Sequence, residues 1–185
     1  MSKIFLIYST GDGQTAKISA CIARKISEIN GSITVTLHNG DQPLDPEFSC
    51  ENYDGIIVGS SLRSRKYGKS VIDFIRKYNI DLARRPSAFF SVSLGDSAGW
   101  SKSGMNKLLD GLFKEWRWQP RLVGRFAGAL KYTHYRFWIK WSMSLAGFLM
   151  GYPTDTSRDH ELTNWDDVER FAQEFIAQMS LSLNG

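Results

Sequence analysis

Serine and threonine hydroxyls and glycines are concentrated in residues 9–15, which read STGDGQT. An apolar run, residues 3–8, precedes this stretch, and a pattern with helical periodicity follows it at once. Backbone N–H groups at a helix N-terminus bind phosphate, and nearby hydroxyls add hydrogen bonds to it. The stretch therefore predicts a phosphate-binding loop between a strand and a helix. Its candidate binding residues are Ser9, Thr10, Gly11, Asp12, Gly13, Gln14 and Thr15.

Three types of phosphate-binding loop are compatible with a strand, glycines and a helix in this order. A P-loop closes with Lys followed by Ser or Thr, and the stretch contains no such pair. A dinucleotide fingerprint, G-x-G-x-x-G/A, is matched by residues 11–16. The second predicted strand, however, lacks the terminal acidic residue that this motif requires, because Asp41 falls in the loop beyond it. A hydroxyl-rich loop around a terminal phosphomonoester explains the serine and both threonines. We favour this third type of loop. We also favour it over a simple turn in which Thr15 only caps the following helix.

The elements that would position this loop alternate regularly along the chain. Apolar runs predict strands at residues 3–8, 33–37, 53–59, 87–94 and 121–130. Helical periodicity predicts helices at residues 15–29, 70–78, 104–116 and 164–179, the last of them capped by Thr163. This alternation predicts an α/β fold with a doubly wound parallel sheet covered by helices on both faces. No linker is long enough to divide the 185 residues, so we expect a single domain, residues 1–185.

Positive charge is concentrated in one part of the sequence. Residues 116–154 contain no Asp or Glu but include six of the 23 lysines and arginines. The remainder of the chain is close to neutral, although the chain as a whole carries a formal charge of +4. This asymmetry indicates an anionic partner, for which nucleic acid, lipid head groups and an acidic substrate are the candidates.

Residues 131–153 form an insertion between the last predicted strand and the last predicted helix, where a simple fold needs only a few residues. As a helix, this segment would have aromatic and aliphatic residues on one face and basic residues on the other. Its apolar run is shorter than the about 20 residues that span a bilayer. We therefore predict a helix that lies in the interface of an anionic membrane. The predicted membrane contacts are Arg136, Phe137, Trp138, Lys140, Trp141, Leu145 and Phe148. The alternative is a helix packed on its own domain or on a partner chain, and the apolar face makes nucleic acid a poorer explanation.

The loop and four later segments together resemble a known family. Residues 9–15 resemble the phosphate loop of the flavodoxin superfamily, which binds FMN. The segments ENYD at 51–54, PSAFFSVSL at 86–94, AGALKY at 127–132 and TDT at 154–156 resemble the flavodoxin-like, menaquinone-dependent protoporphyrinogen oxidase family. The resemblance spans nearly the whole chain. It implies a flavodoxin-like five-stranded sheet with strand order 2-1-3-4-5, a bound FMN, and the insertion before the last helix.

The same resemblance implies oxidoreductase activity of the protoporphyrinogen IX dehydrogenase (quinone) type. The enzyme would oxidise protoporphyrinogen IX to protoporphyrin IX in haem biosynthesis and pass the electrons to a membrane quinone, either menaquinone or ubiquinone. Because the flavin carries the redox chemistry, no catalytic side chain and no metal site are predicted. The N-terminus shows no signal peptide, so we expect the chain at the cytoplasmic face of the inner (plasma) membrane, held there peripherally. The sequence leaves open whether the chain forms a homo-oligomer.

Two loops would flank the flavin, because open α/β sheets bind ligands at the carboxyl ends of their strands, where the strand order reverses. In the loop after the fourth strand, the resemblance implies flavin contacts from the backbone of Ser91, Val92, Ser93 and Leu94. Trp100, a little further along, is a candidate for stacking on the ring.

The loop after the third strand, residues 60–69, is rich in basic side chains. The resemblance implies that Arg63 pairs with the propionates of the porphyrinogen, since arginine forms bidentate pairs with carboxylates. The alternative is a solvated surface turn. The Tyr-Gly-His that follows this arginine in the family is replaced here by Ser64, Arg65 and Lys66, so Arg63 alone is transferred as a substrate residue.

Three other functions fit parts of the pattern. A flavodoxin-type electron carrier is typically acidic around its flavin, whereas this loop is basic and the sequence pI is about 9.1. An NAD(P)H:quinone reductase would need a second nucleotide site, which the sequence does not show. A non-catalytic membrane-docking module would keep the fold without the chemistry.

Overall fold

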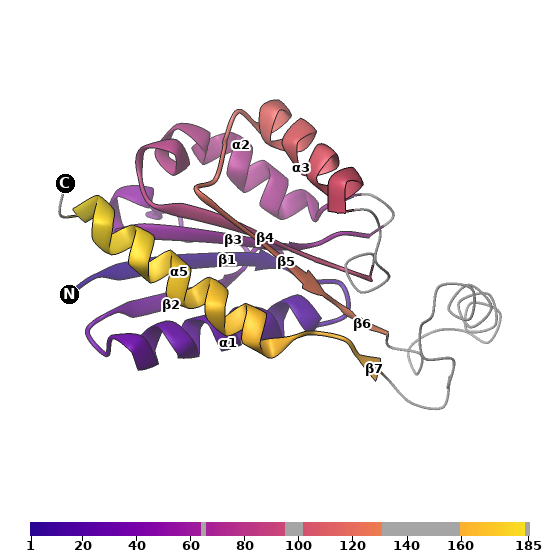
Figure 1. Cartoon of the computed structure of the whole chain (residues 1–185). Coiled ribbons are helices and arrows are strands. Elements are labelled where there is room, and N and C mark those ends of the chain that lie inside the picture. Colours follow the sequence, from indigo (N-terminus) through magenta and orange to yellow (C-terminus); the bar gives the residue numbers. More distant parts are fainter. Residues whose placement is uncertain (64–65, 95–101, 131–159, 184–185) are drawn as a thin grey trace, which may run out of the picture.

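The computed structural model describes residues 1–63, 66–94, 102–130 and 160–183 (Figure 1). Its centre is a five-stranded parallel sheet in the order β2-β1-β3-β4-β5, so the predicted strand order is confirmed. The strands are β1 (Lys3–Ser9), β2 (Thr34–Asn39), β3 (Gly55–Ser61), β4 (Ser87–Ser93) and β5 (Leu122–Ala127).

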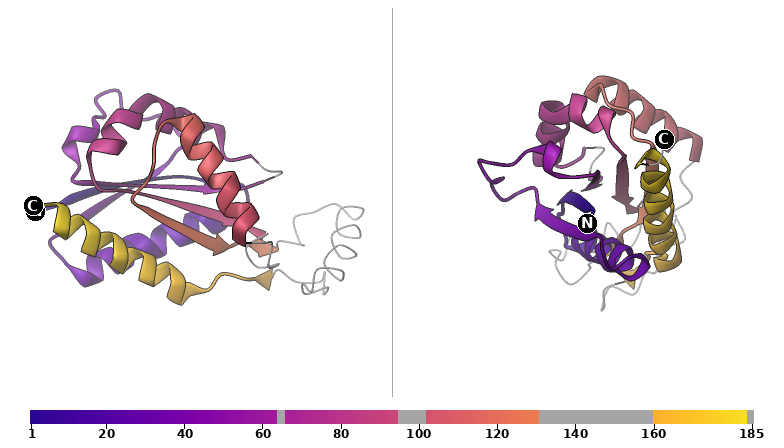
Figure 2. Two further views of the ribbon diagram at one scale, coloured as in Figure 1. Left: turned by 45° about the horizontal axis from the view of Figure 1, so that its top comes forward. Right: turned by 90° about the vertical axis from the view of Figure 1, so that its left-hand side faces the viewer.

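Helices cover both faces of the sheet. On one face lie α1 (Gln14–Ile29) and α5 (Trp165–Leu183), and on the other lie α2 (Lys69–Arg84) and α3 (Lys102–Trp116) (Figures 1 and 2). A single 3₁₀ turn, η1 (Cys50–Asn52), precedes β3. None of the helices within the described ranges is long and apolar enough to cross a membrane.

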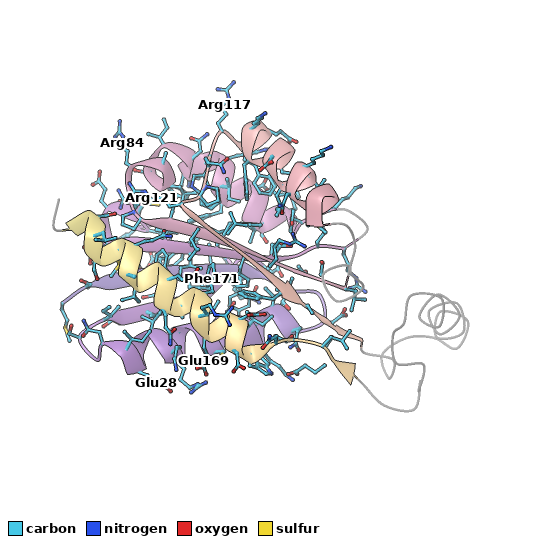
Figure 3. All side chains as sticks on the ribbon, viewed as in Figure 1. Glu28, Arg84, Arg117, Arg121, Glu169 and Phe171 are labelled. Carbon is cyan, nitrogen blue, oxygen red and sulfur yellow. The ribbon has the colours of Figure 1, made fainter. Side chains whose placement is uncertain are left out.

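The central strands are buried on both faces, and most of their buried side chains are apolar. Successive side chains of a strand point to opposite faces. In β1, Ile4 and Leu6 join the core cluster formed with α1 and α5, whereas Phe5 and Ile7 join the cluster formed with α2 and α3. Figure 3 shows Phe171 between α5 and the sheet. The continuous apolar run at the start of the sequence is therefore typical of a strand between two helical layers.

Helix α2 extends six residues beyond its predicted end. The predicted helix ends at Tyr78, where the backbone leaves helical values, with φ −113° and ψ 18°. The helix then continues to Arg84 and buries Leu82 completely. Leu82 lies seven residues after Ile75 and four after Tyr78, so the apolar period of the first half continues past the kink to this buried residue.

The predicted strand at residues 121–130 is divided in the structure into two strands that belong to different sheets. Strand β5 ends at Ala127, and Gly128 leaves the ladder: its N–H donates to Ser93 O at 3.1 Å, and its carbonyl accepts from Leu162 N at 3.1 Å. The next two residues, β6 (Ala129–Leu130), pair antiparallel with β7 (His160–Glu161). The insertion predicted at 131–153 lies outside the described residues, but the segments that flank it are thus held side by side.

The predicted cap of the last helix is wrong. Helix α5 begins at Trp165, and Asn164 Oδ1 accepts a hydrogen bond from Asp166 N at 3.1 Å, so Asn164 is the capping residue. Asp166 and Asp167 stabilise the same first turn through the helix dipole. The hydroxyl of Thr163 instead donates to Ala127 O at 2.7 Å, which ties the start of α5 to the end of β5.

Candidate functional site

The loop of residues 9–15 lies between the carboxyl end of β1 and the N-terminus of α1. It is closed by Thr10, whose Oγ1 accepts a hydrogen bond from Gly13 N at 3.0 Å. Gly13 has φ 84°, a left-handed conformation that favours glycine, and it occupies the N-cap position of α1. The threonine and the glycine together thus bend the chain directly from strand to helix.

The N-terminus of α1 presents backbone donors at this bend. The first intrahelical bond runs from Lys17 N to Gly13 O at 3.1 Å, so the N–H groups of the preceding residues have no helical acceptor. Gly13 has no side chain with which to cap them, and the first turn contains no acidic residue. Since the helix dipole adds partial positive charge here, the loop is suited to bind an anion such as phosphate.

Gln14 connects this loop to the far side of the site. It is buried, and its Nε2 donates to Thr163 Oγ1 at 2.9 Å, whose hydroxyl continues to Ala127 O on β5. The other end of the amide, Gln14 Oε1, is buried with no hydrogen-bond partner in the described part of the chain. A buried acceptor without a donor is costly, so this atom fits a site that is completed by a ligand with hydroxyl or N–H donors.

Buried serines end the neighbouring strands at the same edge of the sheet. They hold the loop of residues 60–69 against that edge: Ser60 Oγ accepts from Gly68 N at 3.0 Å, and Ser91 Oγ accepts from Tyr67 OH at 2.9 Å. Tyr67 is only 6% exposed, and its ring packs edge-on against Phe89 and Trp116. The loop is therefore anchored in the core at its end.

Arg63 and Gly68 lie directly against the loop of residues 9–15. Gly68 approaches Ser9 so closely that a Cβ at Gly68 would lie 2.1 Å from Ser9 Oγ. Arg63 reaches Asp12, with Nη1 at 3.5 Å from Oδ1, and its guanidinium lies over Gly11. The structure thus brings Arg63 to the phosphate loop, about 50 residues earlier in the chain. Tyr67 and Gly68 were not identified from the sequence; the only local signal is a glycine next to a helix start.

The four residues predicted to contact the flavin, 91–94, lie at the end of β4 and directly after it. Ser91, Val92 and Ser93 belong to β4 and are buried, and Leu94 follows the strand half-buried. The carbonyl of Val92 accepts from Leu62 N at 2.8 Å, and that of Ser93 accepts from Gly128 N. These residues are therefore at the expected edge of the sheet, and their contacts with a flavin stay a prediction. Trp100 lies outside the described residues, as do the seven predicted membrane contacts between Arg136 and Phe148.

An ion pair flanks the site where β7 meets α1. Lys17 Nζ lies 2.9 Å from Glu161 Oε2. Burial alone would raise the pKa of Glu161, but the hydrogen bond and charge of Lys17, with smaller contributions from Trp165 and Gln14, hold that pKa below its usual value. The pair therefore fastens β7, one of the two segments that flank the insertion, to the first turns of α1.

Groups for nucleophilic or metal chemistry are not assembled at this edge. Within the described ranges no cluster of three or more His, Cys, Asp or Glu side chains is placed to hold a metal ion. Cys50 is buried, and this burial, aided by the charge of Asp81 and opposed by Arg85, raises the pKa of its thiol to about 11. Such a thiol is protonated at neutral pH and is a poor nucleophile.

The arginines of the cationic segment that the structure describes do not converge on one patch. Arg121 Nη1 donates to Ser182 Oγ at 2.6 Å, and Arg125 Nη1 donates to Asn106 Oδ1 at 3.0 Å. Arg117 points away from the sheet (Figure 3). These three arginines therefore do not support a common binding surface for an anion.

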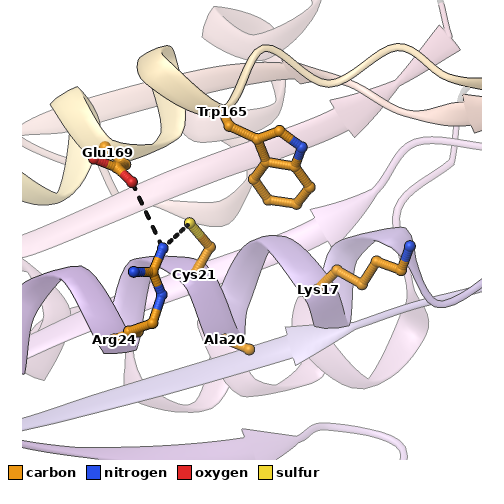
Figure 4. Close-up of a pocket in the computed structure, with 6 residues that line it drawn as sticks. All are labelled: Lys17, Ala20, Cys21, Arg24, Trp165 and Glu169. Carbon is orange, nitrogen blue, oxygen red and sulfur yellow. Dashed lines mark hydrogen bonds and ion pairs between the residues drawn. The ribbon is translucent and has the colours of Figure 1, made fainter.

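A separate open groove of about 380 Å³ lies between α1 and α5, lined by Lys17, Ala20, Cys21, Arg24, Trp165 and Glu169 (Figure 4). Its charged groups are already paired, since Arg24 contacts Glu169 at 3.6 Å and Cys21 Sγ at 3.7 Å. The groove offers no counterpart to the backbone donors of the phosphate loop, so we place the functional site at the carboxyl edge of the sheet.

Comparison with known proteins identifies relatives of this arrangement. The model of a family described as "Flavodoxin domain" matches residues 5–157. Protoporphyrinogen IX dehydrogenase [quinone] of Escherichia coli (strain K12) is 30% identical over 173 residues, which cover 93% of each chain. The protein of the same name from Leishmania major is 30% identical over 176 residues, which cover 95% of this chain and 75% of that one.

Solved structures resemble the chain in fold. Oxidised flavodoxin 1 from Bacillus cereus superposes with a TM-score of 0.58 at 18% identity, over 95% of this chain and 98% of that one. At this level of identity the likeness concerns the architecture, namely the five-stranded sheet and its helical layers.

Proposed function

The chain belongs to the flavodoxin-domain family, and on that premise we propose that it is an FMN-dependent dehydrogenase of protoporphyrinogen IX. It would oxidise protoporphyrinogen IX to protoporphyrin IX for haem synthesis and pass the electrons to a membrane quinone, menaquinone or ubiquinone. The observation that carries the proposal is the loop of residues 9–15, in which Thr10 fixes Gly13 and leaves the N-terminus of α1 open toward an anion. The names of the relatives support the substrate and the acceptor.

The residues at the carboxyl edge fit FMN better than a dinucleotide. The phosphomonoester would bind the N–H groups of the loop and the hydroxyls of Ser9, Thr10 and Thr15, which lie between the end of β1 and the first turn of α1. Gln14 Oε1 would accept from a hydroxyl of the ribityl chain, which satisfies its buried acceptor. When bound, FMN supplies two-electron oxidation and reduction.

The protein's own contribution would then be to bind, orient and shield. Tyr67 and Gly68 hold residues 66–69 against Ser91 and Ser60 at the carboxyl edge of the sheet, and this segment would help to exclude water from that side. The backbone of residues 91–94 would contact the polar edge of the flavin ring. No side chain is assigned a proton-transfer step.

We also place the enzyme peripherally at the cytoplasmic face of the inner (plasma) membrane. Support comes from the sequence of the insertion, where Arg136 and Lys140 would face anionic lipid and Trp138 and Trp141 would enter the interface. A membrane-bound flavin would meet both a lipid-soluble quinone and a hydrophobic porphyrinogen there.

The test is an anaerobic reaction of the purified, FMN-loaded protein with protoporphyrinogen IX and a soluble quinone analogue. Porphyrin fluorescence should rise with time and depend on both the protein and the quinone. A Thr10→Ala/Thr15→Ala variant, loaded in the same way, is the control for bound flavin. Fluorescence that rises no faster than without protein would contradict the proposal and favour a flavodoxin-type carrier, and rapid NAD(P)H oxidation would favour a quinone reductase.

A further inference from the structure

We infer that Arg63 is part of the cofactor phosphate site, where its guanidinium both contacts the phosphate and offsets the charge of Asp12. The inference rests on the proposed binding of FMN at residues 9–15. It differs from the role expected from the sequence, in which the same arginine pairs with the carboxylates of the porphyrinogen.

The position of the guanidinium is the first observation. Arg63 Nη1 lies 3.5 Å from Asp12 Oδ1. A Cβ added at Gly11 would lie 2.9 Å from Arg63 Nη1, 3.7 Å from its Cδ and 3.8 Å from its Cζ. The arginine side chain thus lies close to the backbone of residues 9–15 at Gly11.

The backbone that carries Arg63 is held in place on both sides. Leu62 N donates to Val92 O at 2.8 Å, which joins this segment to the end of β4. Arg63 and Lys66 exchange two backbone hydrogen bonds, of 2.9 and 2.8 Å. Further along, Tyr67 is bonded to Ser91. The side chain therefore starts from a fixed point, and its reach to the phosphate loop does not depend on a free loop.

Charge explains why an arginine is needed there. Asp12 places a carboxylate in the loop that would receive a phosphate dianion, and like charges at such short range repel each other. A guanidinium has five N–H donors in a planar fork. Arg63 can therefore keep its contact with Asp12 and still donate to a phosphate oxygen. Because the Arg63 side chain is 57% exposed, water weakens the interaction, and the effect on affinity should be moderate.

The experiment measures flavin binding to the apoprotein, with riboflavin as the probe that lacks the phosphate. Quenching of flavin fluorescence gives the Kd of FMN and of riboflavin for the parent, Arg63→Ala, Asp12→Asn and Arg63→Ala/Asp12→Asn. The matched control is Lys69→Ala, which removes a cation at the end of the same loop, where α2 begins. Lys69 is 90% exposed and pairs with Asp73 on its own helix.

The inference predicts that Arg63→Ala weakens FMN binding by about 3- to 10-fold, less than a fully buried charge-assisted hydrogen bond would give because the side chain is exposed, and changes riboflavin binding by less than about twofold. The double variant should recover part of the loss, because it also removes the carboxylate charge of Asp12 that would repel the phosphate. Lys69→Ala should change both constants by less than about twofold.

Two outcomes would overturn the inference. If Arg63→Ala binds FMN as tightly as the parent does, the arginine does not contact the phosphate; a raised Michaelis constant for protoporphyrinogen IX in that variant would then restore its role as a substrate residue. If FMN and riboflavin binding fall equally, the arginine supports the fold of the loop. A parent protein that binds neither flavin would instead contradict the proposed function itself.

Discussion

Replacing Gly68 with alanine tests whether the loop of residues 60–69 must lie directly on the phosphate loop. Gly68 has φ −59° and ψ 131°, which any residue adopts, so the backbone tolerates alanine. The obstacle is a contact: a Cβ at Gly68 would lie 2.1 Å from Ser9 Oγ and 2.5 Å from Ser9 Cβ. The segment cannot simply move away, because Gly68 N donates to Ser60 Oγ at 3.0 Å.

The size of the effect follows from these two contacts. Overpacking at a closely fitted position costs about 1–3 kcal/mol, and loss of the Ser60 hydrogen bond would add about 0.5–1.5 kcal/mol. We expect Gly68→Ala to lower the free energy of unfolding by about 1.5–4.5 kcal/mol. Because Ser9 begins the phosphate loop, FMN affinity should fall as well. Gly111 provides the control, since nothing lies within 4 Å of its added Cβ. In helix α3, Gly111→Ala should stabilise the protein by about 0.5–1 kcal/mol.

The assay is urea unfolding followed by circular dichroism, combined with an FMN titration. A Ser9→Gly substitution removes both atoms that the new Cβ would meet, so the Gly68→Ala/Ser9→Gly double variant should be more stable than the sum of the single effects predicts. We expect this coupling to be about 1 kcal/mol or more. Additivity within about 0.5 kcal/mol, or a Gly68→Ala protein as stable as its parent, would refute the proposed fit between the two loops.

Three further predictions concern the phosphate loop, the ion pair beside it and the insertion. Thr10→Ala with Thr15→Ala should weaken FMN binding by about two orders of magnitude or more, since each lost bond to a charged group is worth about 1.5–3 kcal/mol; a double variant that keeps its flavin through dialysis would contradict the loop assignment. Glu161 has a lowered pKa in the folded protein, so its pairing with Lys17 stabilises the fold above the unfolded value near 4.5 and is lost as the pH falls through the folded value. In urea unfolding from pH 7 downward, the parent should lose more stability than Glu161→Gln, and equal pH profiles would count against the pair. Replacing residues 133–152 with a short Gly/Ser linker should leave a folded, flavin-binding domain that no longer sediments with anionic liposomes, and Trp138→Glu with Trp141→Glu should act in the same direction. A variant that sediments like its parent would remove the basis for membrane binding, and a linker variant that does not fold would assign the segment to the core.

The parallel sheet and the strand-to-helix turn at residues 9–15 could be predicted from the sequence because their signals are local, whereas phosphate binding by that turn stays a prediction. Most residues buried between two helical layers are apolar, so the centres of β1 and β3 appear as the continuous apolar runs 4–7 and 56–58. A loop that turns from strand to helix around an anion needs glycine and hydroxyl side chains in consecutive positions, and residues 9–15 supply them. Membrane binding by the insertion stays a prediction from the same kind of local pattern.

Only the tertiary structure decided which residues far apart along the chain form hydrogen bonds with one another. Thr163 precedes a helix and therefore has the sequence pattern of its cap. In the structure its hydroxyl instead donates to Ala127 O, and its Oγ1 accepts from Gln14 Nε2, 149 residues earlier in the chain. Asn164 then caps the helix in its place. A threonine that can satisfy either a helix end or a buried neighbour has no local preference strong enough to decide between them.

Arg63 shows the same limit for function. Its residue type and its place after the third strand predict an anion contact, and this much the sequence determined by itself. Which anion it faces depends on where the chain after β3 folds back. That path is set by two hydrogen bonds, from Leu62 N to Val92 O and from Tyr67 OH to Ser91 Oγ, and by the absence of a side chain at Gly68. These contacts place the guanidinium over Gly11. They join segments that only the packed sheet brings together, because hydrogen bonds and steric fit act between neighbours in space and not along the sequence.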